Sequence, residues 1–277
     1  MPRATFPHSV ISLLLVGLIA GCVAEVPPTD PDALITRLVE LLNDPNPDVR
    51  QTAAIALGKI ARPQAAPALV EKLRDPDPIF RRDSAWALGN MGDEVMDQVG
   101  VALVERLGDP SDEVKTAAAQ ALGRMRATPD LVERLTQTLR RGDVSTKRAA
   151  VQALALLEAP TSYPALVEEI RDDDARVRQG AIAALGELAD ARALPLIRDR
   201  LLHDRDVGIR SEAAFRLGKF GDATVTSALK SAAAHDGNAD VRRWALWAGA
   251  QLSGRGGSDL GLRPGQSPAG GPGAECR

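Results

Sequence analysis

Histidine and cysteine are the side chains that most readily ligate metals or act as nucleophiles, and here neither recurs at a useful spacing. His203 and His235 lie 32 residues apart at equivalent positions of a repeated pattern, and His8 lies near the N-terminus. Cys22 and Cys276 are too few for a disulfide framework or a four-cysteine zinc site. We therefore expect no metal, no cofactor and no catalytic residue. The sequence predicts a protein that is not an enzyme and has no small-molecule substrate.

The composition narrows the class of protein further. The net charge of −3 over 277 residues is close to neutral, so no general attraction to nucleic acid is expected. Aromatic residues make up 3% of the chain and apolar residues 44%. Ala and Leu must therefore do most of the packing, which favours helices over β-sandwiches or barrels.

A basic residue marks a phrase that returns along the chain, as in "DPNPDVRQTAAIALGKI" (44–60) and "DPDPIFRRDSAWALGNM" (75–91). Its seven occurrences, 31 to 34 residues apart, are Arg50, Arg81, Lys115, Lys147, Arg178, Arg210 and Arg242. Four residues before each marker is a side chain that can accept hydrogen bonds from the first turn of a helix. These are Asn46, Asp77, Ser111, Asp143, Asp174, Asp206 and Asn238. A helix is predicted to begin there in every copy.

Each predicted helix has one apolar stripe and one column of small residues. The stripe repeats at offsets of 4, 4 and 3 residues, which defines one face of an α-helix. The small residues, such as Gly58, Gly89 and Gly218, would let neighbouring helices approach closely. A second apolar run, such as "PALVEKL" (67–73), precedes each phrase. The predicted fold class is therefore all-α, a solenoid of about seven two-helix units stacked over residues 32–253.

The phrase "DPxPxVRxxAAxALGxI" and the unit of about 32 residues resemble HEAT repeats, more narrowly the phycobilisome-lyase-type HEAT-like class with its armadillo-type fold. The resemblance covers about residues 32–253. The sequence departs from the HEAT pattern in the fourth copy, where Arg141 replaces the turn aspartate, and in the seventh, where Gly249 replaces a leucine. The weaker seventh unit suits a capping repeat.

The resemblance also assigns roles to charged and aromatic columns. Asp44, Asp75, Asp109, Asp172, Asp204 and Asp236 lie six residues before a basic marker. In HEAT proteins such columns form ladders between repeats, so we expect a structural role. The second helix lines the concave surface of such solenoids, and large aromatic and Arg side chains there are candidate anchors for a partner. The candidates are Arg82, Trp86, Asn90, Gln120, Arg124, Phe215, Lys219, Trp244 and Trp247. The alternative is that the aromatic side chains pack against adjacent helices or cap the last repeat.

The N-terminus is predicted to be a signal peptide, residues 1–21. Its apolar run is too short to span a bilayer, and Ile19-Ala20-Gly21-Cys22 resembles the lipobox of bacterial lipoproteins. The resemblance implies lipidation of Cys22, the palmitate-bearing anchor, with residues 22–31 as a short tether. An ordinary secreted protein cut nearby is the alternative. Residues 254–277, rich in Gly, Pro and Ser, are predicted to be a disordered tail in which Cys276 is a free thiol.

Together these features predict a non-catalytic HEAT-repeat scaffold or adaptor that binds protein partners in the bacterial cell envelope. The lipid anchor would hold it at a membrane, the outer membrane facing the periplasm if the host is Gram-negative. One rival is a bilin lyase or isomerase-like activity on a chromophorylated protein, which the repeat class suggests but an export signal contradicts. A second rival is nucleic-acid binding, which the near-neutral charge disfavours.

Overall fold

The computed structural model describes residues 30–253, and within that range every regular element is helical. Fourteen α-helices form seven antiparallel hairpins, and no strand occurs among the described residues. The predicted all-α fold class is confirmed. The predicted signal peptide 1–21, the tether up to residue 29, Cys22 and the tail 254–277 with Cys276 lie outside the described residues.

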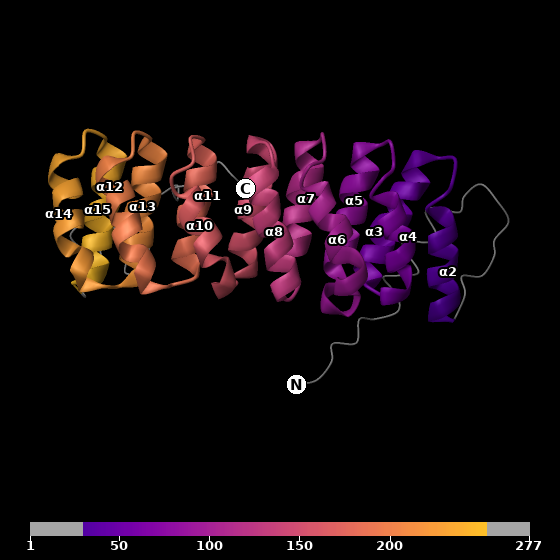
Figure 1. Ribbon diagram of the computed structural model, residues 1–277. Coiled ribbons are helices and arrows are strands. Elements are labelled where there is room, and N and C mark those ends of the chain that lie inside the picture. The colour runs from indigo at the N-terminus through magenta and orange to yellow at the C-terminus, as the bar shows by residue number, and fades with distance from the viewer. Residues whose placement is uncertain (1–29, 254–277) are drawn as a thin grey trace.

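The seven hairpins follow one another along the chain in single file (Figure 1). They are α2 (Pro31–Leu41) with α3 (Pro47–Ile60), α4 (Ala66–Lys72) with α5 (Pro78–Asn90), α6 (Met96–Arg106) with α7 (Asp112–Leu122), α8 (Pro129–Arg141) with α9 (Val144–Leu157), α10 (Tyr163–Glu169) with α11 (Ala175–Glu187), α12 (Leu194–His203) with α13 (Val207–Phe220), and α14 (Thr226–His235) with α15 (Ala239–Leu252). Short 3-10 helices precede five of the first helices: η1 (Pro63–Ala65), η2 (Gly92–Val95), η3 (Pro160–Ser162), η4 (Ala191–Ala193) and η5 (Ala223–Val225).

The second helix of each hairpin begins where the sequence predicts it. Six of the seven predicted N-cap side chains accept a hydrogen bond from the first turn, which satisfies a backbone N–H that has no partner inside the helix. Ser111 is the exception, because its hydroxyl donates to Glu113 Oε2 at 2.6 Å and does not cap α7. Pro47 and Pro78 stand at the start of α3 and α5, where the missing N–H costs nothing.

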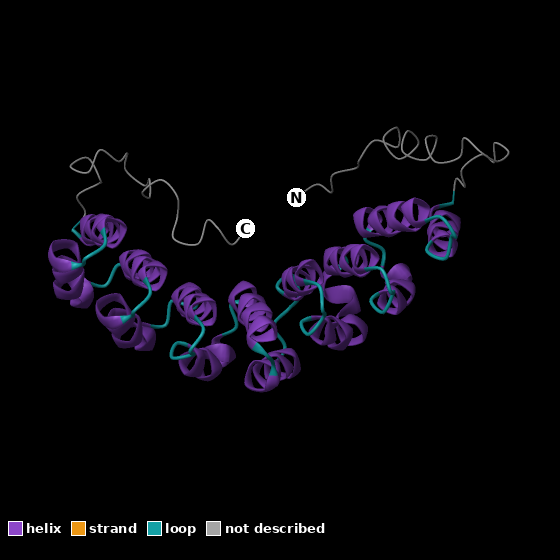
Figure 2. Cartoon of the chain, turned by 90° about the horizontal axis from the view of Figure 1, so that it is seen from above, coloured by secondary structure: helices purple, strands orange, loops and turns teal. Residues whose placement is uncertain are grey.

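The hairpins form an arc of two helical layers (Figure 2). The second helices line the inner side of the arc, and each packs extensively on the second helices of its neighbours. The column of small residues explains this close packing. A Cβ added to Gly89 would lie 2.6 Å from Ala121 Cα, and one added to Gly218 would lie 2.8 Å from Ala248 Cα. Only glycine fits at these points, so close packing offsets the cost of glycine inside a helix.

The fourth hairpin differs from the others more than the replacement of one aspartate by Arg141 suggests. Helix α8 continues to Arg141 itself, and Gly142 takes the extended C-cap conformation that Asp204 takes after α12. Two residues separate α8 from α9, whereas three separate α12 from α13. The turn is therefore one residue shorter, and a glycine occupies the place of the expected acid.

None of the helices within residues 30–253 is long and apolar enough to cross a membrane.

Candidate functional site

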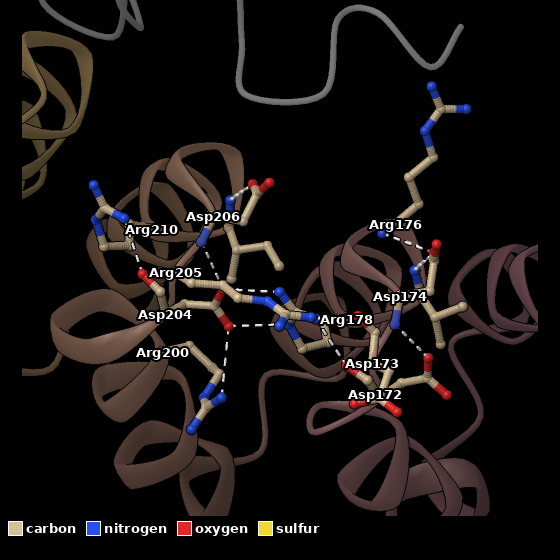
Figure 3. A network of polar contacts seen from close by, with 12 residues as sticks. Asp172, Asp173, Asp174, Arg176, Arg178, Arg200, Asp204, Arg205, Asp206 and Arg210 are labelled. Atoms are coloured by element: carbon tan, nitrogen blue, oxygen red, sulfur yellow. Dashed lines mark hydrogen bonds and ion pairs between the residues drawn. The ribbon is translucent and has the colours of Figure 1, made fainter.

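The acid and base columns pair with each other between adjacent hairpins. In the most buried pair, Arg178 Nε and Nη2 each donate to Asp204 at 3.0 Å, and the two side chains are 4% and 2% exposed. Arg178 Nη1 also donates to the carbonyl oxygens of Asp172 and Asp173, at 2.8 and 2.9 Å (Figure 3). One guanidinium thus ties its own turn to the next one. We call such a marker–aspartate pair between hairpins a rung.

Three further rungs repeat this arrangement. Arg81 donates to Asp109 at 2.7 and 2.8 Å, Arg210 donates to Asp236 at 2.7 and 3.1 Å, and Lys147 donates to Asp172 at 2.6 Å. Burial alone would raise the pKa of the rung aspartates, but hydrogen bonds from the basic partner and from the backbone hold it below its usual range. The expected ladder therefore forms at four joints, whereas Asp44 and Asp75 accept hydrogen bonds from backbone amides of their own turns.

A hollow lies on the inner side of helices α3, α5 and α7, and we call it the inner groove. It encloses about 750 Å³. Its lining consists of Ile55, Lys59, Arg82, Asp83, Trp86, Asp112, Glu113, Thr116, Ala117 and Gln120. A half-buried indole, Trp86, lies so close to α3 that its Cζ3 atom would be 2.7 Å from a Cβ on Gly58. The absence of a side chain at Gly58 therefore leaves the space that the Trp86 indole occupies against α3.

Charged side chains around the inner groove are largely engaged with one another. Arg82 Nε donates to Asp83 at 2.8 Å, and the amide of Gln51 donates to the other oxygen of that buried carboxylate at 2.7 Å. On α7, Lys115 donates to Asp112 at 2.8 Å, which lowers the pKa of that exposed carboxyl group. The groove thus combines an aromatic and aliphatic floor with polar groups along its walls.

The structure brings three of the predicted partner residues together in the inner groove: Arg82, Trp86 and Gln120. Asn90 and Arg124 lie beyond its lining, where Arg124 Nη1 donates to Asn90 Oδ1. Sequence reasoning did not select Lys59, Asp112, Glu113 or Thr116, which also line it. Lys59 lies in the last turn of α3 and the other three lie in the first two turns of α7, so they meet at the groove only through the packing of three helices.

The remaining predicted anchors form a cluster at the other end of the arc. The Phe215 ring centroid lies 5.4 Å from that of Trp244 and 5.5 Å from that of Trp247, and the two tryptophans are 5.6 Å apart. Lys219 Nζ lies 5.6 Å from the Phe215 centroid and is exposed. Trp244 and Trp247 are only 2% and 6% exposed, so the expectation that they are exposed is wrong. They pack against adjacent helices, which is the alternative that the sequence left open for them.

Known proteins agree with this architecture. A family model for HEAT repeats matches residues 35–99, 100–181 and 163–250, so the chain belongs to the HEAT repeat family. No curated protein matches the sequence. Among solved structures, importin beta is 18% identical with a TM-score of 0.58, covering 87% of this chain and 37% of its own. That similarity supports the solenoid fold.

Two other solved structures are less similar in shape. The complex of CpcE and CpcF of phycocyanin lyase from Nostoc sp. PCC7120 is 22% identical, with a TM-score of 0.47, and the match covers 83% of this chain and 98% of that chain. An engineered protein is 23% identical, also with a TM-score of 0.47, and the match covers 79% of this chain and 68% of that chain. The narrower resemblance to the lyase-type class stays a prediction.

Proposed function

We propose that this HEAT-repeat solenoid is a non-catalytic scaffold that holds a protein partner in its inner groove and is tethered to a membrane of the bacterial cell envelope through Cys22. The inner groove carries the proposal. It is a hollow of about 750 Å³ on three adjacent inner helices. Its floor holds the side chain of Trp86, which is partly exposed to solvent. Partly exposed aromatic side chains beside arginine are favoured anchors of protein interfaces.

The arrangement of polar groups also favours a protein partner. Thr116 and Gln120 lie on one face of α7, one turn apart, and both line the groove. A hydroxyl and a side-chain amide can each donate and accept hydrogen bonds, so they can pair with the backbone of a bound segment. A groove of this size would bury the end of a loop or helix from a partner.

A photo-crosslinking residue placed at Gln120 tests the location of the partner. Expressed in the native envelope, this variant should give a discrete crosslinked species, because Gln120 is exposed in the groove. The matched control carries the same residue at Val101, which is exposed on α6 in the outer layer. Adding Trp86→Ala to the Gln120 variant should remove most of the crosslinked species. Equal crosslinking at both positions, or none at Gln120, would contradict the proposed site.

The anchor is tested separately. About eight residues lie between Cys22 and α2, so the tether would span at most roughly 26 to 29 Å and keep the first hairpin near the membrane. Two acyl chains would give stable attachment where one gives only marginal binding. Radiolabelled palmitate should be incorporated into the wild type and into the matched control Cys276→Ser, and not into Cys22→Ser. Equal labelling of Cys22→Ser and the wild type would refute the anchor without affecting the groove.

A further inference from the structure

The rungs between hairpins are not continuous along the arc. They join α5 to the turn before α7, α9 to the turn before α11, α11 to the turn before α13, and α13 to the turn before α15. At the α7–α9 joint the marker Lys115 meets no rung aspartate. Its Nζ donates instead to the hydroxyl of Ser145 and to Asp112 of its own helix.

The short turn of the fourth hairpin is the physical cause. Because α8 runs on to Arg141, Gly142 stands where the other turns hold the rung aspartate. A Cβ on Gly142 would lie 2.8 Å from the carbonyl oxygen of Thr138 and 2.8 Å from Thr146 Cγ2. No side chain fits there, so the gap follows from the backbone and not from one substitution.

The apolar core continues across the α7–α9 joint, but the polar interactions there are weaker than a rung. Leu156, 47% exposed, lies over Gly123 on the inner side. Lys115 attracts Asp143, and Arg148 attracts Asp112, but both carboxylates are exposed and water screens such attractions. In every rung, by contrast, the basic side chain reaches a largely buried aspartate of the next hairpin, and water screens such a pair less.

The α3–α5 joint also lacks a rung, but it is held by other contacts. Gln51 donates to Asp83 at 2.7 Å and Lys72 donates to Asn43 at 2.6 Å, both between the first two hairpins. Only one hairpin, α2–α3, lies on the N-terminal side of this joint, so bending there would move little of the molecule.

We propose that the α7–α9 joint is a hinge that divides the solenoid into two rigid blocks, α2–α7 and α8–α15. The inner groove lies entirely in the first block, and the Phe215–Trp244–Trp247 cluster lies entirely in the second. Bending at this joint changes the curvature between the blocks and leaves each of them intact. A partner longer than the groove would then select its own curvature. The hinge itself does not depend on what the groove binds.

Distances between paired spin labels test the hinge in the full-length chain with Cys22→Ser and Cys276→Ser. Labels at Val101 and Glu133 report on the α7–α9 joint from the outer helices α6 and α8. The matched control has labels at Arg198 and Lys230 on α12 and α14, across a joint with a rung. All four side chains are exposed. The Val101–Glu133 distance distribution should be at least about twofold wider than the control distribution.

Restoring the missing rung should remove the difference. The variant replaces Gly142 and Asp143 with the three residues found at 204–206 and combines this with Lys115→Arg. It should narrow the Val101–Glu133 distribution to the width of the control. Raising the salt concentration should widen the wild-type distribution and leave the control unchanged, because only the hinge depends on exposed charges. If the grafted variant does not fold, the wild-type comparison still decides. Equal widths in the wild type at both joints would overturn the hinge.

Discussion

Trp86 and Trp247 occupy the same place in their repeats and have different surroundings. Each lies five residues after its basic marker, and each rests on a glycine of the preceding inner helix. Trp86 Cζ3 would lie 2.7 Å from a Cβ on Gly58, and Trp247 Cζ3 would lie 3.0 Å from one on Gly218. Trp247 is nonetheless 6% exposed, whereas Trp86 is half-buried in an open groove. The position in the repeat sets where the indole lies, and the side chains around it determine whether solvent reaches it.

Two neighbouring positions account for the difference. Two residues after the marker, the seventh hairpin has Trp244 where the second has Asp83. Phe215 on the preceding inner helix completes the aromatic cluster around Trp247, while the corresponding residue beside Trp86 is Ile55. Apolar area that is buried in the cluster remains available in the groove. The last hairpin uses its tryptophan for stability, and we infer that the second hairpin uses its own for binding.

The largest expected effect separates these two roles. Trp247→Ala should lower the free energy of unfolding by about 3 to 5 kcal/mol, because a large buried side chain leaves a cavity. Trp86→Ala should lower it by only about 1 to 2 kcal/mol, because part of the indole is already exposed to solvent in the groove. Urea denaturation followed by far-UV circular dichroism measures both.

The part of the chain that loses stability provides a second test. Since each hairpin contacts its neighbours, the loss in Trp247→Ala should be concentrated in the last hairpin. Hydrogen exchange should then speed up in α14 and α15 before it does so elsewhere. Equal destabilisation by the two substitutions would remove the distinction between a structural and a binding tryptophan.

The sequence predicts the fold well because the repeat constrains it many times over. N-cap side chains, apolar stripes and small residues recur in every copy, and the seven hairpins form as these patterns indicate. In the sequence, Arg141 stands as a plain substitution for the turn aspartate. The shorter turn could not be seen, because the point where α8 ends depends on Gly142 and not on the spacing of the markers.

The candidate site is predicted only in part. Arg82, Trp86 and Gln120 were selected because their columns point away from the core, and they line one groove. Trp244 and Trp247 were selected by the same rule and are buried. A column specifies direction on a single helix, whereas exposure depends on side chains from the next hairpin. Lys59, on the other side of the groove, was missed because one helix alone does not show what a groove encloses.

The stability contributions of Asp109, near the groove, and Glu212, near the aromatic cluster, should change in opposite directions with pH. Near the groove, burial favours a raised pKa for Asp109, but hydrogen bonds from Arg81 and from the Ser111 amide lower it. Its charged form therefore stabilises the fold at any pH above about 3.8, and this contribution is lost as the pH falls through the lowered value. Near the aromatic cluster, burial raises the pKa of Glu212, and Arg216 offsets this only in part. Its charged form is therefore less favourable in the folded protein than in the unfolded chain.

Asp109→Asn should therefore lower the free energy of unfolding by about 2 to 3 kcal/mol at pH 7, because a buried charge-assisted pair is lost. The difference from the wild type should shrink only below about pH 4. For Glu212 the sign is opposite, so its contribution grows as the pH falls from neutral toward about 4.5. Urea denaturation at several pH values distinguishes them. A difference for Asp109→Asn that shrank between pH 7 and pH 5 would contradict the assigned direction.

The smallest expected effect tests Gly218, the glycine against which Trp247 packs, as Trp86 packs against Gly58. Gly218→Ala should lower the free energy of unfolding by about 1 to 3 kcal/mol, because the new Cβ would lie 2.7 Å from Ala248 Cβ and force the inner helices apart. Gly249→Ala is the matched control one helix further on. A Cβ there would meet nothing within 4 Å, so the helix should be stabilised by about 0.5 to 1 kcal/mol. Opposite signs in thermal or urea unfolding would show that close helix approach, and not glycine as such, makes Gly218 important for stability. If both substitutions stabilised the protein, close approach at Gly218 would not be what requires glycine beside Trp247.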